Sequence, residues 1–196
     1  MLFTLVACTN SNSNEFYDNG VLKVKGKTIN NKKEGEWVYF SPDGDTLSKT
    51  LYKKGKLNGK NLIFENNKVK EIRNYTADIE NGERILFHDN GNILARGLIK
   101  EGNQHDKWVV YFENGKIQST FEFDQGNKIG RELSYYESGE TEAEIDHTDS
   151  LTIIKAYDSL GKIIWHLRVY DDIIDTLEFN KEFFDKLYPN GIPSDN

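Results

Sequence analysis

Residues 107–116 read KWVVYFENGK, an aromatic and apolar run that ends in an Asn-Gly turn signal. The same order, an aromatic residue followed within four positions by a turn glycine or asparagine, occurs seven times at intervals of 22 to 24 residues. The turn residues are Gly20, Gly44, Asn67, Gly91, Gly115, Gly139 and Gly161. A unit this short buries too little apolar surface to fold alone, so successive units must stack on one another. The period therefore predicts a repeat array with one elongated surface.

The composition favours β structure and argues against a nucleic-acid partner. Aromatic residues make up 12% of the chain, and short apolar runs alternate with Gly, Asn and Asp. The net charge of −7 is concentrated in residues 131–196, which carry 15 acidic and 6 basic side chains. Because no basic stripe is available for phosphates, we expect no nucleic-acid partner. A single cysteine excludes an internal disulfide and a cysteine-based zinc site.

The N-terminus combines an apolar stretch with that single cysteine. Residues 1–8 read MLFTLVAC and precede the polar run TNSNSN. This order resembles the lipobox of bacterial lipoproteins, in which the cysteine becomes the lipidated N-terminus and the polar run a flexible tether. We therefore expect Cys8 to be lipidated. No Lys or Arg precedes it, so the other interpretation, a short apolar N-terminus with a stray thiol, stays open.

Each repeat unit is predicted to be a β-hairpin. The tips carry Asp-Gly, Asn-Asn, Asn-Gly or Ser-Gly, which tolerate the positive φ of a tight hairpin turn. Between tips, second strands such as residues 117–123 alternate with period two. A further small or polar residue stands fifteen residues after five of the tips, and we expect a second turn there. These residues are Gly35, Gly59, Gly82, Asp106 and Gly130.

The pattern Gly-x-Trp-x-x-Tyr/Phe, followed by Glu/Asp-Asn-Gly-Lys and a strand, resembles the MORN-repeat variant as found in bacterial YwqK-type antitoxins. Residues 35–40 and 107–116 carry the pattern best. The resemblance covers residues 16–144, with departures at Asn67 and Asp106. It implies a row of antiparallel hairpins in one long twisted sheet that contacts proteins, and it implies no catalytic residue.

The first strands of the hairpins have one constant and one variable face. Branched side chains recur on the constant face, and we interpret this row as structural. The row includes Val38, Leu62, Ile85, Val109 and Leu133. The variable face changes from unit to unit and carries residue types that dominate interface hot spots. We predict that a partner binds Trp37, Tyr39, Arg84, His88, Trp108, Phe112 and Tyr136. The alternative is that the two tryptophans are packed inside the fold.

The chain offers no set of residues for catalysis or for a cofactor. None of the four histidines stands at metal-ligand spacing from another, and no nucleophile, base and orienting group occur together. We therefore predict a non-enzymatic protein with no cofactor and no metal site. We interpret the acidic run at residues 137–144 as a solvated face that protects a sheet edge, with a weak calcium site as the alternative.

The C-terminal part is expected to close the array. Residues 162–170 are more apolar than any repeat strand, which is typical of a strand buried on both faces. In residues 175–188, four apolar side chains from Phe179 to Leu187 have helical spacing. We predict a short helix that caps the last sheet edge, with a docking helix as the alternative.

The predicted fold is mostly β, an elongated antiparallel hairpin array with a short C-terminal helical cap. Its predicted parts are a truncated lipoprotein signal with a polar tether at 1–15, hairpin repeats at 16–146, and a degenerate repeat, closing strand and cap at 147–196. The leading hypothesis is a monomeric interaction scaffold, lipid-anchored in the bacterial cell envelope, that binds a protein or an envelope polymer. The second is an antitoxin-like protein that neutralises a partner toxin, which fits a cytoplasmic location better.

Overall fold

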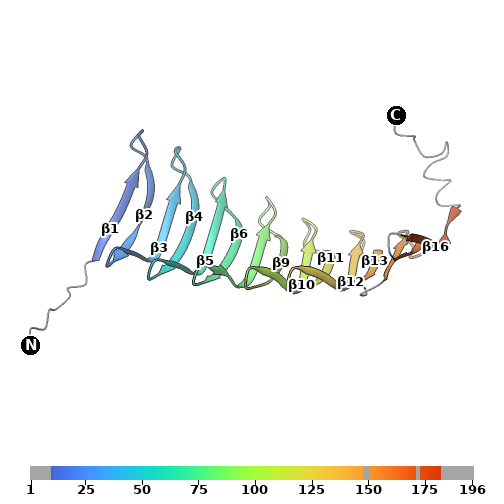
Figure 1. Cartoon of the computed structure of the whole chain (residues 1–196). Helices are drawn as coiled ribbons and strands as arrows, with labels where there is room; N and C mark the ends of the chain where they lie inside the picture. Colours follow the sequence, from blue (N-terminus) through green and yellow to red (C-terminus); the bar gives the residue numbers. More distant parts are fainter. Residues whose placement is uncertain (1–9, 148–150, 171–172, 182–196) are drawn as a thin grey trace, which may run out of the picture. The chain divides into compact units, whose positions relative to one another are not determined.

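The structure is a computed structural model that describes residues 10–147, 151–170 and 173–181 (Figure 1). Within these residues nearly all regular structure is β, as predicted. The chain divides into two compact units, residues 1–104 and residues 105–196, and each is described by itself. In both units the strands are antiparallel and follow one another in chain order.

In the first unit, consecutive strands form an antiparallel meander. Its strands are β1 (Asn10–Phe16), β2 (Leu22–Ile29), β3 (Lys32–Phe40), β4 (Thr46–Lys53), β5 (Lys56–Glu65), β6 (Lys68–Thr76), β7 (Ile79–Glu80), β8 (Gly82–Phe87) and β9 (Ile93–Lys100). The short β7 and the longer β8 both pair with β6. Figure 1 shows the hairpins of this unit side by side, coloured from blue to green.

The second unit follows the same plan, with each strand paired to the next along the chain. Its strands are β10 (Asn103–Tyr111), β11 (Ile117–Asp124), β12 (Asn127–Tyr135), β13 (Thr141–His147), β14 (Thr152–Tyr157), β15 (Ile163–Tyr170) and β16 (Ile173–Phe179). The first two residues of β10 precede the boundary between the units.

The hairpin tips are three-residue loops that a glycine closes. Between β10 and β11, Phe112 N–H donates to the carbonyl of Lys116, and Gly115 N–H donates to the carbonyl of Phe112, both at 2.9 Å. Gly115 has a φ of +82°, a left-handed conformation that glycine adopts without strain. The same bonds recur at Gly20, Gly44, Gly91, Gly139 and Gly161. Asn66 and Asn67, both with positive φ, form a two-residue turn instead. The predicted tips are therefore confirmed.

The turn that links each hairpin to the next lies earlier in the chain than predicted. The chain reverses at two-residue turns with positive φ at both positions, which are Asn30-Asn31, Lys54-Gly55, Ala77-Asp78, Glu101-Gly102 and Gln125-Gly126. The predicted turn residue Gly35 lies inside β3 with a φ of +70°. Around it, β3 carries two more residues than β2 between the flanking register pairs, which makes this a β-bulge. The same irregularity occurs between β4 and β5 and between β11 and β12.

Each unit is a single layer with few buried side chains. The least exposed apolar residues are Val24, Trp37, Val38, Ile99, Trp108, Phe123 and Ile164. Within the described ranges no second layer covers the strands of either unit. Cohesion therefore comes from neighbouring strands, where each cross-strand side-chain pair contributes about 0.2–1 kcal/mol. The predicted constant face fits this picture, because Val38, Leu62 and Ile85 lie in one cross-strand row.

Trp37, which is only 2% exposed, packs on a glycine of the neighbouring strand. Its ring lies over Gly26, where an added Cβ would overlap the ring atoms. Its Nε1 donates to the carbonyl of Lys27 at 3.1 Å. The ring of Tyr52 meets it edge-on, with the centroids 6.1 Å apart. Gly26 is thus the residue that makes room for the tryptophan.

The N-terminal tether prediction is corrected, because the polar run forms a strand. Asn10–Phe16 are β1, which pairs with β2 along its length. Ser11 Oγ lies 2.7 Å from Thr28 Oγ1 on that strand. Short polar side chains suit an edge strand, and no other described strand pairs with the outer side of β1. Cys8 lies outside the described residues.

The helical cap is not supported where the structure describes the chain. Its predicted first residues, 175–179, belong to β16, and residues 182–188 lie outside the described part. The open backbone edge of β15 explains the difference, because pairing there satisfies the N–H and C=O groups of both strands. The strand β15 is paired on both sides but is not buried on both faces, since Trp165 and Tyr170 are exposed.

Substituting Gly26→Ala is expected to lower the free energy of unfolding by about 1–3 kcal/mol, because the new methyl group must displace the Trp37 ring. Urea denaturation followed by far-UV circular dichroism measures the loss. In a Trp37→Leu background the ring is absent, so the same substitution should cost much less. An equal cost in both backgrounds would show that the ring does not limit the space at Gly26.

Candidate partner-binding face

The cross-strand register defines the variable face of the first unit. Directly paired residues share a face of the sheet, and one row runs from β2 to β9. The row is Val24, Tyr39, Ser48, Ile63, Glu71, Leu86 and Ala95. Trp37 and Arg84 each lie two positions along a strand from a member of this row, so they share the face. Three predicted site residues, Trp37, Tyr39 and Arg84, are thus brought to one surface.

Trp37 and Tyr39 belong to an aromatic cage, which we define as Trp37, Tyr39 and Tyr52. The ammonium of Lys33 lies over all three rings, with centroid distances of 4.3, 5.2 and 4.9 Å in that order. Lys33 Nζ donates to Tyr39 Oη at 2.8 Å, and Tyr39 Oη lies 3.0 Å from Tyr52 Oη. Burial and the hydrogen bond with Tyr39 raise the pKa of Tyr52 to about 12. Tyr52 therefore stays a neutral phenol at neutral pH.

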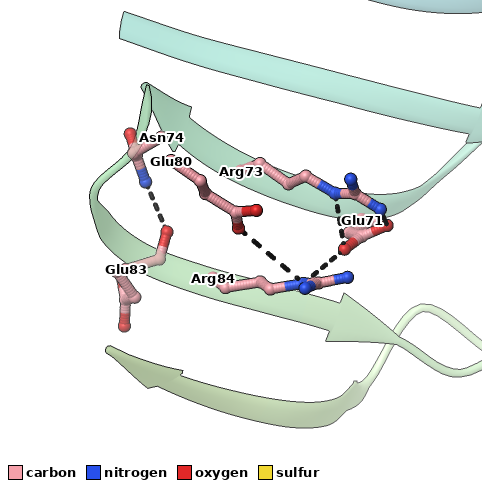
Figure 2. Close-up of polar contacts among 6 residues, drawn as sticks. All are labelled: Glu71, Arg73, Asn74, Glu80, Glu83 and Arg84. Carbon is pink, nitrogen blue, oxygen red and sulfur yellow. Dashed lines mark hydrogen bonds and ion pairs between the residues drawn. The ribbon is translucent and has the colours of Figure 1, made fainter. Parts of the chain in front are cut away.

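Arg84 takes part in an ion-pair cluster on the same face (Figure 2). Glu71 accepts two hydrogen bonds from Arg73, at 2.9 and 2.8 Å. It accepts a third from Arg84 Nε at 2.6 Å, and that nitrogen lies 3.9 Å from Glu80. Two carboxylates and two guanidinium groups balance each other's charge. Arg84 is thus committed to its neighbours rather than being an isolated surface cation.

The surroundings of Glu71 lower the pKa of its carboxyl group. Burial would raise the pKa of Glu71, but the hydrogen bond from Arg73 and the charge of Arg84 outweigh it. The net effect holds the pKa of this carboxyl below its ordinary value of 4.5. The hydrogen bond to Glu71 raises the pKa of Arg73 in turn. Glu71 therefore stays ionised at neutral pH.

In the second unit the corresponding row begins with a branched residue, continues through small residues and ends with two aromatic residues. It consists of Val110, Ser119, Ser134, Ala143, Ala156, Trp165 and Phe179. Trp108 pairs with Phe121 on this face and meets the ring of Phe123 edge-on, with the centroids 6.3 Å apart. It is 7% exposed. Both predicted tryptophans are therefore buried, so a partner would reach the variable face through its half-exposed residues.

His88, Phe112 and Tyr136 each come directly after the last residue of a strand, at the start of a hairpin tip. Each opens its three-residue loop and accepts a hydrogen bond from the loop glycine. The strand has ended at these positions because the chain is already reversing.

The tyrosines at two of the loops connect one hairpin with the next. Tyr136 Oη donates to the carbonyl of Tyr157 at 2.8 Å, and Tyr17 Oη makes the equivalent bond to Phe40 at 2.8 Å. Burial, with smaller contributions from the acidic groups of Glu142 and Asp158, raises the pKa of Tyr136. This geometry gives Tyr136 a structural role in addition to its predicted one.

Sequence reasoning missed Lys33, Tyr52, Glu71 and Arg73 as members of this surface. A signal for two of them is present, because opposite charges at alternate positions of a strand, Glu71 and Arg73, point to the same side. Lys33 and Tyr52 carry no such signal. Tyr52 meets Trp37 and Tyr39 because the register places β4 beside β3, whereas Lys33 lies on β3 itself.

Other kinds of site find little support in the described parts of the chain. Residues 10–147, 151–170 and 173–181 contain no group of three or more side chains placed to hold a metal ion. The same ranges contain no helix long and apolar enough to cross a membrane. A hollow of about 270 Å³ on the constant face of the second unit has acidic and basic walls, including Arg131, Glu144, Asp146 and Arg168. Its mixed charge favours neither an anion nor a cation.

The Glu71→Gln variant is expected to lose less stability on acidification than the wild type. The pKa of Glu71 is lower in the folded state, so its contribution is present above about pH 4.5 and is lost as the pH falls through the folded-state pKa. At neutral pH the variant should be less stable by about 1–3 kcal/mol. Urea denaturation at neutral and acidic pH measures both effects.

Glu83→Gln is the matched control, because Glu83 enters the contacts of Figure 2 only through its backbone carbonyl, which accepts from Asn74 at 2.5 Å. It should retain the stability and the pH dependence of the wild type. If Glu71→Gln kept the full acid sensitivity, the cluster would not be the source of that sensitivity.

Two segments of the chain match the family model of the MORN repeat variant, residues 33–54 and residues 107–125. The first covers β3 except its first residue, the tip loop and β4, and the second covers most of β10, its tip loop and β11. Each match ends inside one of the two-residue turns, so each corresponds to one hairpin. No curated protein matches the chain. Two hairpins, one in each compact unit, are therefore similar to the MORN repeat variant.

Proposed function

We propose that this protein is a non-catalytic, monomeric scaffold that binds a protein or an extended cell-envelope polymer along its variable face. The observation that carries the proposal is a sheet face on a repeating backbone that no other described element covers. The loops and turns repeat from hairpin to hairpin, whereas the side chains of the face change from the aromatic cage to the Glu71 cluster. A regular backbone with changing side chains is the arrangement by which repeat proteins present extended binding surfaces.

The half-exposed residues of this face suit contact with a macromolecule. In the first unit they include Tyr39, Ser48, Ile63 and the Glu71 cluster, which together offer an aromatic ring, a hydroxyl group, an apolar side chain and paired charges. Ordered charge pairs and tyrosines favour specific contacts, because their geometry is fixed before a partner arrives. The predicted residues Tyr39 and Arg84 both lie in this region.

We further propose that Cys8 anchors the protein to a bacterial membrane through a lipid. The support is the sequence MLFTLVAC and its resemblance to a lipobox. Strand β1 begins at Asn10, two residues after Cys8, and two residues span at most about 7 Å. An anchored form would therefore hold the edge of the first unit close to the lipid surface. Labelling of the full-length chain with palmitate, lost in Cys8→Ser, tests this step.

The antitoxin-like role is the alternative that the resemblance to YwqK-type proteins suggests. In that case the partner would be a toxin, and the protein would act in the cytoplasm. Palmitate labelling separates the two, since a lipidated envelope protein would not meet a cytoplasmic toxin. Growth rescue of a toxin-expressing cell by the Cys8→Ser form would favour the antitoxin role.

A crosslinking pair tests which face binds. A photoreactive amino acid at Ser48 points to the variable face and one at Lys49 points to the constant face, because adjacent strand residues face opposite sides. Both positions are half-exposed and lie in β4, so the two variants are matched. In cells of the native organism, the Ser48 probe should capture a defined partner and the Lys49 probe should not.

Capture from Lys49 alone would move the binding surface to the constant face and contradict the proposal. Equal capture from both positions would indicate nonspecific contact. A partner captured from Ser48 should also bind purified protein, and this binding should weaken in Tyr39→Ala while the far-UV circular dichroism spectrum stays unchanged.

A further inference from the structure

The aromatic cage is an arrangement that binds cations, and a side chain of the protein occupies it. Three rings surround the Lys33 ammonium within 5.2 Å of their centroids, inside the roughly 6 Å range of cation–π attraction. Lys33 forms no ion pair with a carboxylate within the described residues, so the rings and one phenol supply its contacts. Such a site recognises positive charge through aromatic rings and one phenol oxygen rather than through acids.

The three rings are positioned by contacts that do not involve Lys33. Trp37 is held by its bond to the Lys27 carbonyl, by Gly26 beneath the ring and by the edge of Tyr52. Tyr39 and Tyr52 lie on the paired strands β3 and β4 and share a hydrogen bond of 3.0 Å. The cage should therefore keep its shape when the lysine side chain leaves, and a preorganised site binds a ligand at lower cost.

Lys33 can leave the cage without disturbing the sheet. Its backbone carbonyl accepts from Gly55 N–H at 2.8 Å, so the ladder holds its main chain. Its side chain is half-buried and rests on the rings through the ammonium end. A lysine side chain has several rotatable bonds, so it can swing into solvent while the backbone stays in place.

The second unit shows the same lysine position without a cage. Lys128 stands two residues after the turn Gln125-Gly126, as Lys33 does after Asn30-Asn31. Its ammonium binds Glu132 at 2.8 Å and lies 4.3 Å from the centroid of Phe121. In the repeat alignment Glu132 takes the place of Trp37, and His147 takes that of Tyr52. The cage is therefore a property of the hairpin β3–β4.

We propose that the cage of Trp37, Tyr39 and Tyr52 is a binding site for a quaternary ammonium group, such as that of choline, and that Lys33 is its internal competitor. A quaternary ammonium has no N–H group, so it needs only ring faces, which is how aromatic cages recognise such groups. The Lys33 ammonium has three donors, of which Tyr39 accepts one in the cage, so lysine is the poorer occupant. This site needs no protein partner and does not depend on the proposed scaffold function.

Choline binding to the full-length chain, measured by isothermal titration calorimetry, tests the assignment. Lys33→Ala and Lys33→Gln remove the competitor, and both should bind choline about tenfold more tightly than the wild type if the free cage is a minor state. Lys128→Ala is the matched control, since it removes the equivalent lysine where no cage exists, and its affinity should equal that of the wild type. Adding Tyr52→Leu to Lys33→Ala should abolish the gain.

The outcomes separate the two parts of the proposal. No binding by either Lys33 variant, with circular dichroism spectra like that of the wild type, would overturn the site. Equal affinity in the wild type and the Lys33 variants would overturn the role of the lysine, and an equal gain in Lys128→Ala would overturn the location. Vesicles of phosphatidylcholine and of phosphatidylglycerol then distinguish a lipid headgroup from free choline. If only phosphatidylcholine vesicles capture Lys33→Ala, the ligand is the headgroup. If the variant binds choline but neither kind of vesicle captures it, the ligand is the free cation.

Discussion

Backbone hydrogen bonding between neighbouring hairpins is the interaction on which the rest of the structure depends. A single-layer sheet has no opposing layer against which to bury its faces, so each hairpin is held by the strands beside it. The linking turns add bonds between hairpins: Gly55 N–H donates to the Lys33 carbonyl at 2.8 Å, and Gly102 N–H donates to the Glu80 carbonyl at 2.9 Å. Because these bonds link equivalent positions, the spacing of hairpins stays constant while their side chains vary.

The bulges between hairpins determine where large side chains fit. At the bulge between β2 and β3, Gly26 stands opposite the indole of Trp37. At the equivalent bulge between β11 and β12, the ring comes from Phe121 and the opposite residue is Glu132. The space above the bulge is thus filled by an aromatic ring either from the bulged strand or from the strand paired with it, as close packing requires. This exchange converts an aromatic cage in one hairpin into a charged pair in another without a change of backbone.

Local signals predicted the tips well and the linking turns poorly. The tip glycines were found because a three-residue loop needs a left-handed residue, and few side chains other than glycine and asparagine adopt it readily. The glycine at position 35 has the same conformation but serves a bulge, so its conformational requirement could not tell a turn from an irregular strand. The true turns contain Ala77, Glu101 and Gln125, which are unusual at positive φ, and sequence patterns gave them little weight.

The predicted binding face shows the same division. Trp37 and Tyr39 share a side of β3 because period two places alternate residues on one side, which can be read from the sequence. Their common face with Arg84 follows from the register across β3 to β8. The burial of Trp37, the pairing of Glu71 with Arg84, and the position of Lys33 over three rings depend on the register between separate strands. The C-terminal strand is a further case, because its apolar spacing suits a helix while the edge of β15 offers backbone partners.

The sequence by itself determined the hairpin repeat, its tips and the constant row, because these follow from residue conformations and from side-chain alternation within one strand. Only the tertiary structure decided which strands contain bulges, which aromatic rings are buried and which charges are paired. The physical reason is that these properties arise between strands, where a shift of one residue in register turns every side chain to the other face.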